Sequence, residues 1–191
     1  MNLIHLVPKR FVVEHDDHYA IAIPFEIAVI PLLIGIVWWM GIPWETLRLD
    51  HRLIAVGASI GIAIYGTLAA LATLLPEAVL VQIEDNPPEP DSRVRQVVDC
   101  FTWSAAEEIV FRGIIQHALT QIVGLVAALL IASALFGLGH GPRNLPRVLA
   151  TGVVGMALGI LFFVTGNLWA AVAAHITINL ISTFAPKRPH D

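Results

Sequence analysis

Two adjacent glutamates and an arginine, Glu107, Glu108 and Arg112, interrupt a chain that otherwise consists largely of long apolar segments. On a helix with 3.6 residues per turn, Glu108 and Arg112 share one face and can form an ion pair, whereas Glu107 is rotated by about 100°. This spacing predicts that the arginine holds Glu108 and leaves the carboxylate of Glu107 free to react.

Two later pairs of side chains have the same four-residue spacing. Phe136 precedes His140, and His175 precedes Asn179, each within an apolar segment. Glu107 together with His140 can remove a proton from a water molecule, as a general base does. His175 and Asn179 can donate hydrogen bonds to the oxyanion of a tetrahedral intermediate. The three groups of residues therefore predict one catalytic site for peptide hydrolysis.

A serine or cysteine nucleophile is not evident in the sequence. There is no Gly-x-Ser-x-Gly motif, and neither Ser104 nor Ser133 has a convincing partner. The single cysteine, Cys100, excludes an internal disulfide framework and a cysteine-rich zinc site, and we interpret it as a packing residue. These observations favour direct attack by water.

The composition indicates a membrane protein. Of the 191 residues, 57% are hydrophobic and only 14% are charged, and the mean hydropathy is +0.75. An ordinary soluble domain is nearer a quarter charged. The net charge of −4 provides no basic surface for nucleic acid, so we expect membrane lipids and a peptide or lipidated protein substrate as partners.

The apolar segments predict an all-α fold, a multi-pass bundle of about six membrane helices, since about 20 residues cross the hydrocarbon of a bilayer. The expected helices cover residues 20–42, 53–75, about 93–119, 122–138, 148–165 and 168–184. The third of these carries the Glu-Glu motif and is mixed in polarity, so its polar side must be buried in protein or face water. Along the chain we expect a polar N-terminal segment (1–19), two transmembrane spans (20–83), an acidic proline-rich loop (84–95), the catalytic helical core (96–184) and a polar C-terminal tail (185–191).

The positions of lysine and arginine predict the orientation in the cell membrane. With six spans, eight of the 11 Lys and Arg residues fall on the side that holds both termini, and cytoplasmic loops carry such an excess. Both termini are therefore predicted to be cytoplasmic. This topology places Glu107, His140 and His175 in the cytoplasmic half of the bilayer, where they can meet.

The three motifs resemble those of the CPBP family, the CAAX-protease and bacteriocin-processing group that includes the type II CAAX prenyl endopeptidases. The matching residues are Glu107-Glu108-x-x-x-Arg112, Phe136-x-x-x-His140 and His175-x-x-x-Asn179, in a region of roughly 96–184. The resemblance implies a glutamate-dependent intramembrane endopeptidase without a required metal or other cofactor. It also implies that Glu107 and His140 activate water and that His175 and Asn179 form the oxyanion hole.

The resemblance leaves the substrate open. CAAX endopeptidases remove a C-terminal tripeptide from prenylated proteins, whereas other members of the group are linked to bacteriocin maturation or immunity. Two alternative functions remain at this stage. Glu107, His140 and His175 can form a three-ligand zinc site with one open position for water, although no His-Glu-x-x-His motif is present. The chain can also be a non-enzymatic membrane protein, such as an immunity factor, in which Glu108 and Arg112 only stabilise a helix.

Overall fold

The structure, a computed structural model, describes residues 16–76 and 92–185, and side chains are described from residue 28 onward. Within these ranges all regular structure is helical, which confirms the predicted all-α fold. Most of the polar N-terminal segment, of the acidic proline-rich loop and of the C-terminal tail lies outside the described residues. The elements are α1 (Asp16–Trp39), α2 (Trp44–Leu47), α3 (His51–Ala72), α5 (Arg93–Glu108), the π-helix η3 (Ile109–Gln116), α6 (His117–Val123), α7 (Leu125–Gly139), α8 (Leu145–Thr165) and α9 (Leu168–Phe184).

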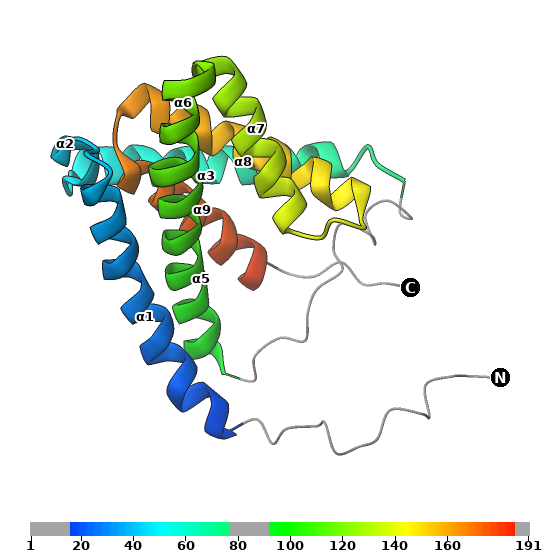
Figure 1. Cartoon of the computed structure of the whole chain (residues 1–191). Helices are drawn as coiled ribbons and strands as arrows, with labels where there is room; N and C mark the ends of the chain where they lie inside the picture. Colours follow the sequence, from blue (N-terminus) through cyan, green and yellow to red (C-terminus); the bar gives the residue numbers. More distant parts are fainter. Residues whose placement is uncertain (1–15, 77–91, 186–191) are drawn as a thin grey trace.

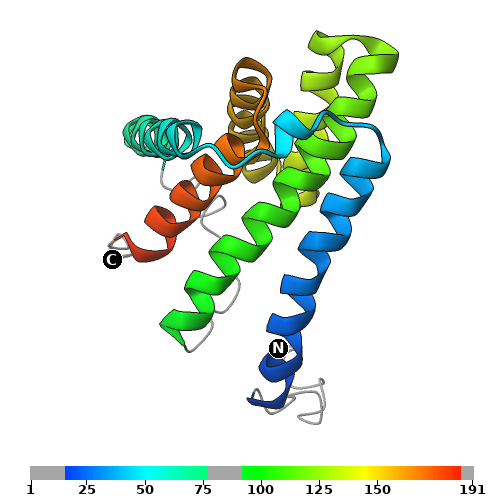
Figure 2. The ribbon, with the colours of Figure 1, turned by 90° about the vertical axis from the view of Figure 1, so that its left-hand side faces the viewer.

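The helices do not all run in one direction. Helices α1 and α5 lie side by side, and both cross α3 and α8 at a steep angle in two perpendicular views (Figures 1 and 2). Helix α9 packs against both α3 and α5, and α7 packs along α8. Because α9 contacts helices of both directions, it connects the Glu-Glu helix to the rest of the fold.

Short polar side chains begin three of the helices. Asp50 accepts hydrogen bonds from the backbone N–H groups of Arg52 and Leu53, at 2.8 and 3.4 Å, at the start of α3. Asn144 and Asn167 cap α8 and α9 in the same manner. Capping satisfies backbone donors that a helix leaves unpaired at its first turn. Ser92 occupies the corresponding position before α5, but its side chain makes no capping hydrogen bond.

Glycine and alanine allow two pairs of helices to approach closely. A Cβ atom on Gly61 of α3 would lie 2.5 Å from the carbonyl oxygen of Ala174 in α9, and one on Gly57 would meet the carbonyl of Ala170. Gly137 of α7 fits equally closely against the backbone of α8. Small residues at four-residue spacing are typical of helix contacts in lipid, which agrees with the glycine- and alanine-rich sequence of these segments.

Two helices of the described ranges, α3 and α8, are long and apolar enough to cross a membrane. Three shorter apolar stretches occur at residues 28–39, 125–139 and 168–184. The predicted helical segments therefore exist with shifted boundaries, and a helical membrane bundle is supported. The count of six spans and the cytoplasmic termini stay predictions.

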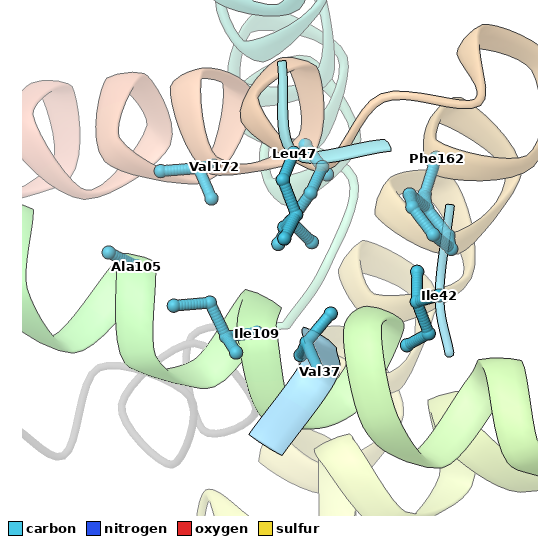
Figure 3. Packing of buried hydrophobic residues seen from close by; sticks show 9 residues of the cluster. Val37, Ile42, Leu47, Ala105, Ile109, Phe162 and Val172 are labelled. Carbon is cyan, nitrogen blue, oxygen red and sulfur yellow. The ribbon is translucent and has the colours of Figure 1, made fainter. Parts of the chain in front are cut away.

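The N-terminal helices support the Glu-Glu helix. A cluster of buried apolar residues joins α1, α2, α5, η3, α8 and α9 and consists of Val37, Ile42, Leu47, Ala105, Ile109, Phe162, Leu168, Ala171 and Val172 (Figure 3). Trp169 and Asn167 additionally donate hydrogen bonds to the carbonyl groups of Leu47 and Arg48, at 2.7 and 2.8 Å. The described residues between 37 and 48, in the region of the two predicted N-terminal spans, thus contribute directly to the packing of the region that carries the motifs.

Candidate active site

Four elements bring the predicted site residues together. The end of α5 carries Glu107 and Glu108, His140 directly follows α7, and the body of α9 carries His175. Arg112 lies in η3, directly after α5. The contacts between these five side chains form one connected network.

The carboxylate of Glu108 is completely buried and is held by two partners. Arg112 Nη1 donates to Glu108 Oε1 at 3.1 Å, and Arg112 Nε lies 3.0 Å from Oε2. His175 Nδ1 donates to Oε1 at 2.8 Å. The expected ion pair is therefore present, and a histidine from a helix distant in sequence joins it. Each charge of this buried pair faces the opposite charge, which offsets part of the cost of burying them, although Glu108 Oε2 makes no hydrogen bond among the described residues.

Arg112 also connects the site to α8 and to an aromatic ring. Its Nη2 donates to the carbonyl oxygen of Gly155 at 2.7 Å, and its guanidinium carbon lies 4.7 Å from the centre of the Phe136 ring. One turn later, Gln116 Nε2 donates to the carbonyl oxygen of Gly159 at 3.1 Å. A Cβ atom on Gly155 would lie 3.1 Å from the ring of Phe136, and one on Gly159 would lie 2.7 Å from the amide oxygen of Gln116. The two glycines, four residues apart on α8, thus make room for Arg112 and Gln116, four residues apart on η3.

The π-helical geometry of residues 109–116 corrects the sequence prediction of an uninterrupted α-helix to about residue 119. A π-helix has i→i+5 hydrogen bonds and is frequently found at functional sites. The sequence has no proline or other marker that would predict a π-helix here. The π-helix coincides with the segment in which Arg112 and Gln116 donate hydrogen bonds to the backbone of α8. Gly124, with φ +80°, then ends α6 and separates it from α7.

Glu107 is directed away from Arg112 and toward two imidazole rings. Its Oε2 lies 3.8 Å from His140 Nε2 and 3.7 Å from His175 Nε2. These separations are too long for direct hydrogen bonds, but they suit a water molecule that contacts all three groups at about 2.8 Å. The Glu107 side chain is 29% exposed, so water can reach it, whereas Glu108 is inaccessible.

Hydrogen bonds determine the tautomers of both histidines. His140 Nδ1 lies 2.8 Å from the carbonyl oxygen of Phe136, which can only accept, so Nδ1 carries the proton. His175 Nδ1 likewise faces the carboxylate of Glu108. In the neutral rings, both Nε2 atoms are therefore acceptors directed at Glu107. His175 can donate through Nε2 to an oxyanion only when the ring carries both protons.

Phe136 is a residue of this site that reasoning from the sequence left without a role. Its buried ring lies 4.5 Å from the ring of His140, 5.7 Å from that of His175 and 5.0 Å from that of Phe111, between centroids. It thus contacts both histidines and the arginine. Its presence in the Phe136-x-x-x-His140 motif is the signal that identifies it.

Asn179 occupies the next turn of α9 after His175. Its Nδ2 donates to the hydroxyl oxygen of Ser104 at 2.9 Å. Ser104 is fully buried and its partner is an amide rather than a base, and the hydroxyl of Ser133 donates to the carbonyl of its own helix at Leu129. Neither serine has the partner that an activated nucleophile needs. Cys100 is buried and lies 3.7 Å, between Sγ and Oγ1, from Thr183, in a packing position.

Within the described ranges, no group of three or more His, Cys, Asp or Glu side chains has the arrangement expected for holding a metal ion. The candidate zinc ligands Glu107, His140 and His175 nevertheless face one another, with the separations given above. The donor atoms of these three side chains are compatible with either a water molecule or a cation.

A comparison with known protein families gives a match over the region that holds this site. Residues 91–181 match the family model described as type II CAAX prenyl endopeptidase Rce1-like. The match supports the assignment of this chain to the CAAX protease family. The matched region contains all three motifs and the elements from α5 to most of α9, and the family is one of intramembrane endopeptidases. No curated protein and no solved structure gives a significant match.

Proposed function

We propose that this CAAX-family protein is a glutamate-dependent endopeptidase in which Glu107 and His140 activate the attacking water. The observation that carries the proposal is the convergence of Glu107 Oε2 with His140 Nε2 and His175 Nε2, at 3.8 and 3.7 Å, on one accessible position. A carboxylate and an unprotonated imidazole nitrogen are both proton acceptors. A water molecule at that position can therefore lose a proton as its oxygen attacks a carbonyl carbon.

The remaining residues have supporting roles in the proposed reaction. Attack by water gives a tetrahedral oxyanion, which His175 in its doubly protonated form and Asn179 stabilise by donating hydrogen bonds. The carbon–nitrogen bond then breaks, and the proton taken from water passes to the leaving amine. Glu108 and Arg112 hold His175 in place, through the 2.8 Å contact to Nδ1 and the ion pair.

The family suggests the class of substrate. A type II CAAX prenyl endopeptidase cleaves near the C-terminus of a prenylated protein, so we propose a lipidated peptide C-terminus presented from the membrane. The excess of lysine and arginine on one side supports cytoplasmic termini and a site in the cytoplasmic half of the bilayer. No cofactor is needed for this mechanism, because every proton transfer has a protein group to serve it.

The test is cleavage of quenched peptides by purified protein in detergent. Prenylated and unmodified peptides with the same C-terminal sequence are compared, for wild type, Glu107→Gln and His140→Ala. We expect wild type to cleave and each variant to lose at least a hundredfold in kcat, the scale of general-base catalysis. Glu84→Gln, which changes a carboxylate outside the motifs, serves as the matched control and should cleave like wild type.

Three outcomes would contradict parts of the proposal. Equal cleavage by wild type and Glu107→Gln would show that Glu107 is not the base. Loss of activity with a chelator, restored by zinc, would show a metalloprotease that uses the same residues. Preference for the unmodified peptide would exclude a prenylated substrate.

A further inference from the structure

Helices α5 and α9 face each other through three polar contacts on successive turns. From one end to the other, the contacts are Glu108 with His175 at 2.8 Å, Ser104 with Asn179 at 2.9 Å, and Cys100 with Thr183 at 3.7 Å. Each step moves four residues back along α5 and four residues forward along α9. The two helices are thus antiparallel and in register over three turns, and the Ser104–Asn179 contact lies directly beside the pair that holds His175.

The contact between Ser104 and Asn179 holds the amide of Asn179 against α5, with the nitrogen of the amide facing Ser104. Ser104 is fully buried, and its oxygen accepts one of the two N–H groups of Asn179 Nδ2. The second N–H then remains for another acceptor. If the amide rotated by 180°, its carbonyl oxygen would occupy the place of the nitrogen, and a developing oxyanion would be repelled rather than stabilised.

We propose that Ser104 is a positioning residue, which acts through Asn179 by holding its amide with the nitrogen toward α5 and the second N–H available to the oxyanion. This inference rests on the proposed function. Ser104 does not itself touch the reacting atoms, and it lies in none of the three motifs. Its position four residues before Glu108 places it on the same face of α5 as the carboxylate that binds His175.

The test is a double-mutant cycle, read as kcat and KM for the peptide that wild type cleaves. Removing an oxyanion donor by Asn179→Ala is expected to lower kcat by about a hundredfold. Ser104→Ala removes only the orienting acceptor, so we expect about a tenfold fall in kcat with KM unchanged. Because Ser104 acts through Asn179, the double variant should have the kcat of Asn179→Ala alone rather than a thousandfold loss.

Two further variants separate orientation from packing. Ser104→Thr keeps the hydroxyl and should restore most of the kcat that the alanine variant loses. Ser133→Ala is the matched control, since Ser133 is also a buried helical serine but bonds only to its own helix among the described contacts, apart from a weak contact with the sulfur of Met156. It should retain wild-type kcat. If Ser104→Ala does not fold, Ser104→Cys nearly keeps the volume, replaces the oxygen by a weak acceptor, and completes the cycle.

The outcomes distinguish this inference from the proposed function. If Glu107→Gln is inactive and Ser104→Ala has the kcat of wild type, the role of Ser104 is wrong and the mechanism stands. Multiplicative losses in the double variant, or a change in KM alone, would also overturn the inference. If wild type and Glu107→Gln cleave equally, the proposed function is wrong and the inference falls with it.

Discussion

Removal of the arginine at the buried ion pair gives the most direct test of the site's energetics. Arg112→Met keeps an unbranched apolar stem of similar length but removes the charge that faces Glu108. The carboxylate would remain fully buried, with His175 Nδ1 as its one partner among the described contacts of that carboxylate. Breaking a buried pair by removing one member costs about 3–5 kcal/mol, because the other charge is left uncompensated.

The expected loss is large enough to measure by thermal unfolding in detergent. For a chain of this length, each kcal/mol corresponds to about 2–4 °C, so Arg112→Met should lower the midpoint by roughly 6–20 °C. Glu108→Gln combined with Arg112→Met removes both charges. Because a neutral amide costs less to bury, the double variant should recover most of the lost midpoint.

Arg95→Met is the matched control for this prediction. Arg95 and Asp99 form an ion pair on the same helix with the same spacing and an N–O distance of 2.8 Å, but their side chains are 12% and 24% exposed. Partly solvated pairs contribute about 1 kcal/mol or less, so the midpoint should fall by only a few degrees. Equal shifts for the two single variants, or no recovery in the double variant, would refute the argument that burial sets the cost.

Three further predictions concern packing, capping and the aromatic ring. Gly57→Ala should lower the free energy of unfolding by about 1–3 kcal/mol, seen as a lower midpoint in thermal unfolding, because its methyl group meets the backbone of α9. Gly66→Ala has open space and should be neutral or stabilising. The backbone N–H groups of Arg52, and then of Leu53, lower the pKa of Asp50. Asp50→Ala should therefore lower the free energy of unfolding near neutral pH, and the difference in stability from wild type should vanish as the pH falls through this lowered pKa. A difference in stability that persists at acid pH would contradict this prediction. Phe136→Leu should reduce kcat for the cleaved peptide about tenfold or more, since the ring contacts Arg112, His140 and His175. An unchanged kcat would show that the ring only fills space.

The sequence was sufficient to predict the helical fold, because apolar segments separated by proline, glycine and asparagine mark helices and their ends. It was less informative about boundaries. Helix α3, for example, begins at His51 rather than residue 53, since the cap is supplied by Asp50. The crossing of α1 and α5 over α3 and α8 could not be predicted, because hydropathy gives the length of a helix but not its direction relative to its neighbours.

Local spacing also explains which parts of the candidate site could be predicted. The Glu108–Arg112 pair follows from helical geometry alone, and the free position of Glu107 follows from the 100° rotation between adjacent residues. The bond between Glu108 and His175 does not follow, since the two residues are 67 positions apart. Sequence reasoning therefore assigned His175 to the oxyanion or to a zinc site, whereas its Nδ1 is engaged by a carboxylate and only Nε2 remains for either role.

The α5–α9 contacts nevertheless show that a tertiary register can be encoded in two local repeats. Polar or small side chains recur at Cys100, Ser104 and Glu108 in one helix, and at His175, Asn179 and Thr183 in the other. Two antiparallel helices with the same four-residue repeat can align all three pairs at once, and a shift by one turn would bring Glu108 opposite Ala171 or Asn179 instead of His175. A shift that brings Ala171 opposite Glu108 would leave a buried carboxylate without its second partner, which is costly, whereas one that brings Asn179 there would replace the imidazole by a neutral amide. The charge on Glu108 thus selects the register, and the register in turn places Asn179 beside Ser104.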